Sequence, residues 1–443
     1  MRKILILIVT AALAGCGSSN GGAAADVGCS NKGQKDFVLL AMQEWYLWND
    51  LLPGNINVNN FASPEALLAY LTTFSPDDGS GQPIDNFSFI GSAAADQAFF
   101  GEGQFEGVGF SWQQLAVNDF RVTRVFEGSP AALGDLQRGQ RFVALNGRTI
   151  AQIEAAEGFA SAFDTTPLEF TMLETDGVTE FTISLAKDIV TINPIPQWGV
   201  IDAGGGRMVG YLELSTFIST ADPVFDTVFA DFRANGVNDV IIDLRYNGGG
   251  LVTTAELLGD FLGGDVAENL TFSKTLFNAD RAAANNDEEF FERLGNSMSL
   301  SRLVIIATQA TASASELVTN SMAAHVEVAI VGDRTFGKPV GQVGFEFCEK
   351  ILRPTAFQTV NADDFGDYFG GLPVTPGCSA ADDLNIPIGA PDDPNMAAAL
   401  GYLDTGACPA AAAVAGQTRS QLERDLSRAD RRGPPWREFA GAY

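Results

Sequence analysis

The spacing of apolar and polar positions changes along this chain, and the changes divide it into regions. From residue 36 to about residue 100, apolar residues recur at helical intervals, and Pro64-Glu65 opens a second amphipathic helix that runs through Leu71. This region is therefore predicted to be helical. Its many aromatic residues are interpreted as core, because a dense aromatic run is far more often buried packing than a ligand cage.

Between residues 105 and 187 the pattern becomes the alternation of apolar and polar positions that is typical of strands. Asp176-Gly177 has the composition of a hairpin turn between two of these strands. The region is predicted to be a small β-rich domain around one helix. Its expected strands cover residues 105–112, 120–125, 141–145, 168–173 and 179–185.

From about Ile189 onward, apolar runs alternate with helical patterns. Residues 209–214 are predicted to form a strand, residues 223–235 a helix and residues 240–245 a second strand. This order is typical of an α/β domain with parallel strands. The second strand runs into Tyr246-Asn247-Gly248-Gly249-Gly250, whose glycines let backbone amides approach a ligand closely. A glycine-rich turn alone is a weak signal, and this one lacks the lysine of a phosphate loop.

The stretch with the most distinctive chemistry is residues 302–342. An apolar run that reads as a buried strand is followed by Thr311-Ala312-Ser313-Ala314-Ser315-Glu316, which leads into a helical segment ending near His325. A serine at a strand-to-helix turn has its hydroxyl beside free backbone N–H groups, which can hold a developing oxyanion. Ser313 is therefore a candidate nucleophile.

A serine hydroxyl needs a base before it can act as a nucleophile. The single histidine, His325, lies 12 residues after Ser313 on the same expected helix, roughly 18 Å along its axis. A Ser-His-Asp triad is therefore not expected. Lys338 is the alternative base, since burial can depress a lysine pKa by up to about 3–5 units. Gln342, four residues later, is placed to orient the lysine amine.

These motifs resemble the C-terminal processing (tail-specific) serine peptidases that carry a PDZ domain. The resemblance lies in TASASE followed by TFGKxxxQ, with the lysine 25 positions after the serine, and in the family's DLRxNxGG motif, here DLRYNGGG. It implies an α/β (ClpP/crotonase-like) catalytic core and a Ser313–Lys338 dyad completed by Gln342, with Ser313 rather than Ser315 as nucleophile. Some members carry an aspartate on the following helix, where this chain has Ala324.

The same resemblance implies an oxyanion hole. Its donors would be the amide of Ala314 and the amide of either Gly249 or Gly250, and the sequence does not choose between the two glycines.

A second resemblance concerns the β-rich region. Ser129-Pro130-Ala131, followed by residues 139–147 ending in Asn-Gly, is similar to a PDZ domain. In that fold Gly107-Val108-Gly109-Phe110 would be the loop whose amides capture a peptide's terminal carboxylate, while the next strand pairs with the peptide. The module either binds peptides in this way or serves only as a lid.

The N-terminus has the pattern of an export signal. Arg2 and Lys3 precede an apolar run at residues 4–14, which is too short to span a bilayer. The run ends in Leu13-Ala14-Gly15-Cys16, which resembles a bacterial lipobox and implies cleavage before Cys16 and lipidation of that residue. Gly17, in place of a retaining aspartate, favours the outer membrane facing the periplasm. The alternative is a secretory signal with an incidental cysteine.

Charge and cysteine content limit the partners and cofactors that are expected for this chain. With 27 basic and 55 acidic residues the net charge is −28, so nucleic acid is not an expected partner. In an oxidising periplasm the four remaining cysteines are expected to form disulfides, with three possible connectivities. Their wide spacing and the lack of a nearby histidine argue against zinc, so neither a metal nor a cofactor is expected. These cysteines are Cys29, Cys348, Cys378 and Cys408.

Together the patterns predict an α/β multidomain serine endopeptidase in the bacterial cell envelope, and the resemblance implies that it cleaves polypeptides near their C-termini. The alternative is a non-catalytic, membrane-tethered lipoprotein of the same fold that binds peptides or other ligands. A penicillin-recognising enzyme would need SxxK at a helix start, and Ser184 to Lys187 lies in a strand-like run. The expected divisions are a signal peptide at 1–15, a tether at 16–35, a helical domain at 36–100, a PDZ-like domain at 101–188, a catalytic domain at 189–408 and a tail at 409–443.

Overall fold

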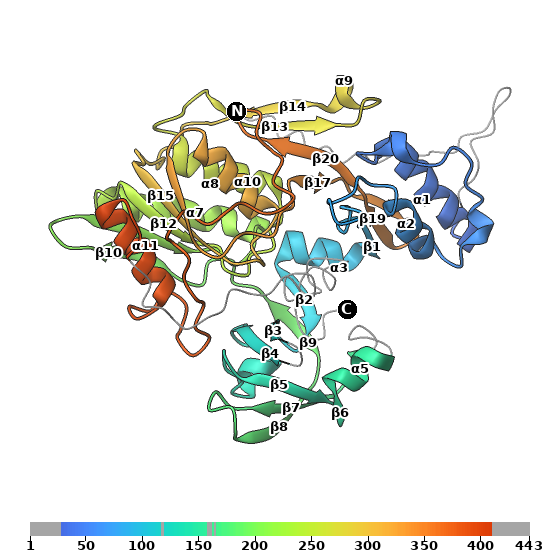
Figure 1. Ribbon diagram of the computed structural model, residues 1–443, viewed down its shortest axis with the longest axis horizontal. Coiled ribbons are helices and arrows are strands. Elements are labelled where there is room, and N and C mark those ends of the chain that lie inside the picture. The colour runs from blue at the N-terminus through green and yellow to red at the C-terminus, as the bar shows by residue number, and fades with distance from the viewer. Residues whose placement is uncertain (1–27, 117–118, 157–161, 164, 410–443) are drawn as a thin grey trace.

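A computed structural model of the chain describes residues 28–116, 119–156, 162–163 and 165–409 (Figure 1). The expected signal peptide, the lipidation site Cys16 and the tail after residue 409 lie outside these described residues. Within the described ranges, no helix combines the length and the apolar character that crossing a bilayer requires.

The largest domain is built on a five-stranded sheet in the order β10-β11-β12-β15-β16. Four of the strands are parallel and β10 is the antiparallel edge strand. The strands expected at 209–214 and 240–245 are β11 and β12. The bounds are β10 (Trp198–Asp202), β11 (Met208–Glu213), β12 (Asp239–Asp243), β15 (Arg302–Ala307) and β16 (Glu327–Gly332).

Helices cover both faces of this sheet (Figure 1). Alternate residues of the parallel strands point to opposite faces: Ile242 packs in the core beneath three helices, whereas Ile241 packs toward a single helix on the other face. Burial on both faces explains why these strands read as continuous apolar runs. The three helices are α7 (Asp222–Ala234), α8 (Val252–Gly263) and α10 (Ala314–Ala323), and the single helix is α11 (Pro394–Thr405).

A second, four-stranded sheet, in the order β14-β13-β20-β17, stands beside the central one. Its strand β17 carries Gln342, so this sheet positions one of the candidate site residues. The elements are β13 (Thr271–Phe277), α9 (Ala282–Asn285), β14 (Asp287–Phe290), β17 (Val340–Gln342) and β20 (Thr355–Val360).

The N-terminal region is mostly helical, as expected, but it also contributes a strand. β1 (Phe89–Ser92) pairs with β19 (Lys350–Arg353), which pairs with β18 (Phe345–Phe347). The partner strand comes more than 250 positions later, so the local pattern of residues does not predict this pairing. The helical elements are α1 (Asn31–Trp45), η1 (Asn49–Leu51), η2 (Val58–Asn60), α2 (Pro64–Thr72), α3 (Ala93–Gln97) and η3 (Ala98–Glu102).

Two disulfides select one of the three possible connectivities. Cys29 is bonded to Cys348, which ties the start of the N-terminal region to the β18–β19 hairpin. Cys378 is bonded to Cys408, which ties the loop between β20 and α11 to the residues just after α11. The first bridge therefore joins two regions of the chain that are far apart in sequence, whereas the second lies within the largest domain.

The β-rich region forms a separate sheet in the order β3-β4-β5-β7-β8, with β6 beside β5, and these strands with α4 and α5 are called the small domain below. The bounds are β3 (Phe110–Ala116), β4 (Asp119–Val125), α4 (Pro130–Leu133), β5 (Arg141–Leu145), β6 (Arg148–Thr149), α5 (Ile150–Ala156), β7 (Leu168–Leu173) and β8 (Glu180–Leu185).

The single strand expected at 105–112 is wrong, because this stretch belongs to two sheets. β2 (Gln104–Gly107) pairs with β9 (Asp188–Thr191) outside the small sheet, whereas β3 forms its edge. The chain turns between them at Gly109, whose φ is 88°. A Cβ atom there would collide with the Ser129 side chain, so the turn requires glycine.

Candidate active site

Ser313 occupies the residue before α10 in a strained backbone conformation. Its φ is 57°, which is uncommon for any residue other than glycine and recurs at functional sites. The turn is held from two sides: the Ala312 N–H donates to the Asn247 carbonyl at 3.0 Å, and the Ser313 N–H donates to Glu316 Oε2 at 2.9 Å. Ser313 itself is half-buried, so its hydroxyl can meet a substrate.

Ser315, the other serine of the turn, is in a different position. It is fully buried, and its hydroxyl donates to the Asn247 carbonyl at 3.0 Å. A hydroxyl that is enclosed and already bonded in this way is unsuited to attack a substrate. The geometry therefore leaves Ser313 as the candidate nucleophile of this motif.

The glycine turn after β12 lies directly against the serine turn. A Cβ atom at Gly249 would come 2.6 Å from Ser313 Cβ and 2.9 Å from the Ala314 nitrogen. The buried Asn247 fixes this turn, since its Oδ1 accepts the Gly249 N–H at 2.9 Å. A Cβ atom at Gly250 would instead collide with the Phe217 carbonyl. The three candidate oxyanion donors therefore come from two turns in contact.

Lys338 and Gln342 are bonded to each other. The Lys338 amine donates to Gln342 Oε1 at 2.9 Å. Gln342 Nε2 in turn donates to the Phe87 carbonyl at 2.6 Å and to the Arg353 carbonyl at 3.2 Å, which fixes the orientation of its amide. The lysine is therefore held by a neutral partner rather than by a carboxylate.

Burial of the amine lowers the pKa of Lys338 from its ordinary value of 10.5 to about 8. Arg353 acts in the same direction, whereas Asp85 and Glu316 favour the charged amine without outweighing burial. A lysine with this pKa is partly neutral near pH 7 to 8, so it is able to accept a proton.

Glu316, which the sequence analysis did not single out, joins the serine and the lysine. Its carboxylate is completely buried and accepts four hydrogen bonds. One oxygen, Oε2, accepts the backbone N–H of Ser313 at 2.9 Å and that of Lys338 at 2.8 Å. The other, Oε1, accepts the Thr335 hydroxyl at 2.5 Å and the Gly337 N–H at 2.7 Å. The backbone N–H groups of the two candidate catalytic residues therefore both donate to the same carboxylate oxygen.

The sequence contains a signal for this residue. Ser313 and Glu316 have the spacing of a capping box, in which an acidic side chain returns to the backbone N–H at the start of its own helix. That signal explains the bond to Ser313 but not the three to residues 335–338. Burial raises the pKa of Glu316, and the four hydrogen bonds act in the opposite direction.

His325 is not brought into this site. It follows the end of α10, where its Nε2 is 2.8 Å from the Thr271 carbonyl and its ring lies edge-on to Phe291. These contacts place His325 beside β13 and away from the serine turn, in agreement with its predicted distance from Ser313 along the helix.

Residues 208–365 match the profile of peptidase family S41, and residues 33–89 match that of the peptidase S41 N-terminal domain. The chain carries the domains of peptidase family S41. This finding confirms the family resemblance of the serine, lysine and glycine motifs, which lie within the first of these ranges.

Two relatives of the chain are named as a carboxyl-terminal-processing protease and a carboxyl-terminal-processing peptidase. The chain is 28% identical over 253 residues to that of Synechocystis, covering 56% of each chain. It is 29% identical over 251 residues to carboxyl-terminal-processing peptidase 3 of Arabidopsis thaliana, covering 54% of this chain and 46% of the relative. The chain thus spans about half the length of the curated relatives it matches.

Solved structures of S41 proteases share the fold. A Bacteroides fragilis protein assigned to the S41 proteases superposes with a TM-score of 0.63 at 23% identity, covering 83% of this chain and 97% of its own. The photosystem II D1 C-terminal processing protease superposes with a TM-score of 0.51 at 19% identity, covering 78% and 92%. The mixed α/β architecture is therefore that of the S41 proteases.

The expected carboxylate-binding loop lies in and beside the small domain. Gly107 ends β2 and Phe110 begins β3. Between them, the Val108 carbonyl accepts the Ala131 N–H at 2.9 Å, and the Gly109 carbonyl accepts the Ser129 hydroxyl at 3.0 Å. These bonds hold the loop against the start of α4.

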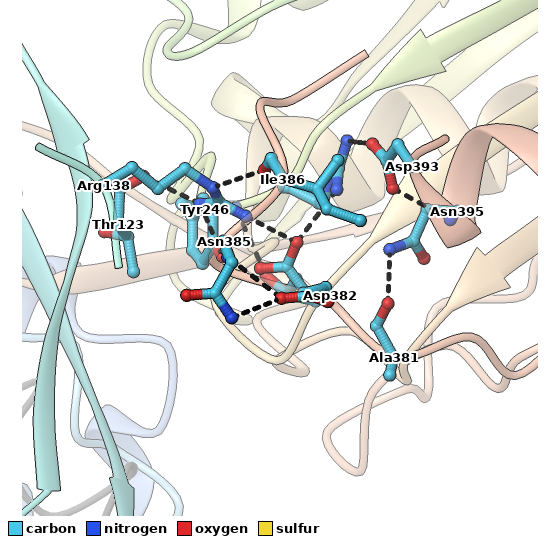
Figure 2. Close-up of polar contacts among 12 residues, drawn as sticks. Thr123, Arg138, Tyr246, Ala381, Asp382, Asn385, Ile386, Asp393 and Asn395 are labelled. Carbon is cyan, nitrogen blue, oxygen red and sulfur yellow. Dashed lines mark hydrogen bonds and ion pairs between the residues drawn. The ribbon is translucent and has the colours of Figure 1, made fainter. Parts of the chain in front are cut away.

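The small domain meets the central domain through half-buried charges. Arg138 donates to Asp382 at 2.7 Å and to the Tyr246 hydroxyl at 3.2 Å, as Figure 2 shows. Asp382 also accepts from Arg245, which is paired with Asp243 and Asp393. Tyr246 belongs to the glycine motif, so a side chain of the small domain touches the turn that faces Ser313.

Proposed function

We propose that this chain is a serine endopeptidase in which Ser313 is the nucleophile, Lys338 the general base and Gln342 the residue that orients the lysine. The observation that carries the proposal is the shared Glu316 oxygen, which holds the backbone of an accessible serine beside that of a lysine with a lowered pKa. The S41 relatives named as carboxyl-terminal-processing proteases support the same reaction.

In the proposed mechanism, neutral Lys338 takes the proton of Ser313 as Oγ bonds to the carbonyl carbon of a peptide. The carbonyl electron pair moves onto oxygen and then returns as the C–N bond breaks, with the lysine giving its proton to the leaving amine. Water next attacks the acyl-enzyme and gives a proton to Lys338. Release of the carboxylic acid returns the proton to Ser313.

The oxyanion formed in each half of the reaction would lie between the two turns. The Ala314 amide belongs to the first turn of α10, where N–H groups lack intrahelical partners. The Gly249 amide is bonded to Asn247 within its own turn, which favours Gly250 as the second donor. Removing one such donor typically costs about 10²–10³-fold in kcat.

The small domain is proposed to be PDZ-like and to bind the C-terminal end of a substrate. Its strand β3 is the edge of the sheet, so its outer side is available to an added peptide strand. The residues proposed to capture the terminal carboxylate are Gly107, Val108, Gly109 and Phe110. Cleavage near C-termini follows from this arrangement.

A cell-envelope location is proposed from the sequence before residue 28 and from the cysteines. Lipidation of Cys16 would attach the chain to a membrane, facing the periplasm from the outer membrane. The disulfides of Cys29 with Cys348 and of Cys378 with Cys408 suit an oxidising compartment. Labelling cells with radioactive palmitate should mark the wild-type protein and leave a Cys16→Ser variant unmarked.

The test of the activity is cleavage of an unstructured polypeptide by purified protein. Wild type should cleave it, whereas Ser313→Ala and Lys338→Ala should each lose at least about 10³-fold in kcat/KM. Ser321→Ala is the matched serine control on α10, because its buried hydroxyl has no hydrogen-bond partner among the described residues. Lys274→Ala is the matched lysine control, since that lysine pairs with Asp364 at the surface.

Each pattern of results has one meaning. Cleavage by wild type and both controls, lost in the two site variants, supports the peptidase. Binding of the polypeptide without cleavage by any of the five proteins would overturn the proposal in favour of a membrane-tethered binding protein.

A further inference from the structure

Phe87 brings the N-terminal region into contact with the candidate catalytic residues. This residue lies between α2 and β1, and 255 positions separate it from Gln342. Its carbonyl accepts the Gln342 N–H at 2.6 Å, which is the shorter of the two bonds that fix the glutamine amide. The side chain that orients the lysine is therefore itself oriented from another part of the chain.

The Phe87 ring also faces the lysine. Its centroid is 5.5 Å from Lys338 Nζ and 6.1 Å from the centroid of the Phe336 ring, to which it is nearly perpendicular. Lys338 is half-buried as a whole, so part of the residue is in contact with solvent. An aromatic ring beside the amine reduces the contact of the amine with water.

Phe87 is held in place by a buried carboxylate. Asp85 accepts the N–H groups of Phe87 and Ser88, both at 3.0 Å, and the Ser88 hydroxyl at 2.6 Å. It also accepts the Thr355 hydroxyl at 3.0 Å, from the strand that pairs with β17. The turn that carries Phe87 is thereby fixed to the sheet that carries Gln342.

We propose that Phe87 is a positioning residue for the lysine–glutamine pair: its carbonyl orients Gln342, and its ring covers the Lys338 amine against water. The proposal rests on the function proposed above. It means that the N-terminal region completes the active site of the catalytic domain.

The ring has two opposite electrostatic effects on the lysine. Excluding water disfavours the ammonium form, whereas a ring face attracts a cation. Burial prevails, because the pKa of Lys338 is lowered. The charged groups that act on this amine are Asp85 and Glu316, which favour the ammonium form, and Arg353, which opposes it. Removing the ring changes none of these charges. It admits water, which favours the ammonium form, and it removes the attraction of the ring, which acts in the opposite direction; we expect the added water to prevail.

The test is the titration of Lys338 in Phe87→Ala, measured in two independent ways. The first is the pH dependence of kcat/KM, and the second is the pH dependence of Lys338 labelling by an amine-reactive reagent, followed by peptide mass spectrometry. Both midpoints should lie near 8 in wild type and at least one pH unit higher in the variant. Well below the midpoint, each unit lowers the neutral fraction, and with it kcat/KM, about tenfold.

Phe61→Ala is the matched control, because Phe61 is a half-buried aromatic of the same region that packs on Tyr70. Its midpoints should equal those of wild type. Phe87→Val is the second variant if Phe87→Ala folds poorly, and it should give a smaller upward shift. An unchanged labelling midpoint in a folded Phe87 variant overturns the inference, even if its rate falls.

The labelling also separates the two proposals. If wild type cleaves no polypeptide but its labelling midpoint moves upward in Phe87→Ala, the peptidase proposal fails while the ring still covers the amine. If wild type cleaves and the midpoint does not move, only the role of Phe87 fails.

Discussion

Lys338 and Arg245 are both held inside the catalytic domain, but their surroundings have opposite effects on their protonation. The Lys338 amine is bonded to the neutral amide of Gln342, and burial lowers its pKa to about 8. Arg245 is 1% exposed and is bonded to three carboxylates, which outweigh burial and raise its pKa. Burial alone therefore does not decide whether a cationic side chain can lose its proton. The hydrogen-bonding partner matters too: a neutral amide lets the effect of burial dominate, whereas carboxylates outweigh it.

This difference matches the position of each residue. Arg245 joins the end of β12 to Asp382 and Asp393 of the C-terminal part, and Asp382 also receives Arg138 from the small domain. A permanently charged residue suits such a junction, because its bonds persist at every physiological pH. Lys338 shares the Glu316 carboxylate with the half-buried Ser313, where the proposed mechanism requires a group that changes its charge.

The largest effect is expected from removing the positive charge of Arg245. Arg245→Met leaves the buried Asp243 and Asp393 without their cation, which should lower the free energy of unfolding by about 3–5 kcal/mol. Urea denaturation followed by circular dichroism measures this loss. Lys274→Met, which breaks a pair at the surface, is the control and should change stability little. Equal losses of unfolding free energy in Arg245→Met and Lys274→Met would contradict the interpretation of Arg245 as a structural charge.

An acidic partner should give Lys338 the protonation behaviour of Arg245. In Gln342→Glu, a carboxylate beside the amine should raise the pKa of Lys338 by about 1–3 units and lower kcat/KM at pH 7 by about 10–10³-fold. The pH–rate profile measures both changes. Gln342→Met, which removes the hydrogen bonds without adding charge, should lose rate without an upward shift of the midpoint. A midpoint that stays near 8 in Gln342→Glu would rule out this account of the lysine.

In the wild-type protein the same pKa predicts the pH dependence directly. In the proposed mechanism the neutral amine is the base, so kcat/KM should rise about tenfold per pH unit below about 8 and level off above it. The slope is upward because a protonated amine cannot accept a proton, and the lowered pKa of Lys338 places the rise near pH 8. A profile that is flat from mildly acidic to alkaline pH would exclude Lys338 as the base.

The smallest effect is expected at the histidine. His325→Gln should leave kcat/KM within about twofold of wild type, because His325 contacts Thr271 and Phe291 rather than the serine turn. Steady-state kinetics on the same polypeptide checks this. A loss of 100-fold or more would mean that the histidine, and not only the lysine, serves the reaction.

Local sequence predicted the elements that carry the site. The strand before Tyr246, the strand before the Ser313 turn and the helix after it follow from patterns of fewer than twenty residues. Ser313, Lys338 and Gln342 were likewise singled out by their order and spacing. Such patterns succeed because the period of side chains in a strand or helix is a property of the local backbone.

Long-range partners were not predictable in this way. β1 was missed because its partner β19 lies far along the chain, and the strand expected at 105–112 was wrong because its two halves join different sheets. Glu316 shows the same limit: its capping-box spacing gives one hydrogen bond, and the other three come from residues 335–338.

The sequence by itself determined which chemical groups this protein has and in which local elements they lie: a serine at a helix start, a lysine and glutamine four positions apart, and a glycine turn after a strand. The tertiary structure alone decided what surrounds them. It put an amide and an aromatic ring beside Lys338 and three carboxylates beside Arg245, and it paired the four cysteines. The reason is physical: a side chain's protonation depends on the solvent and charges within a few ångströms, and those neighbours come from distant parts of the chain.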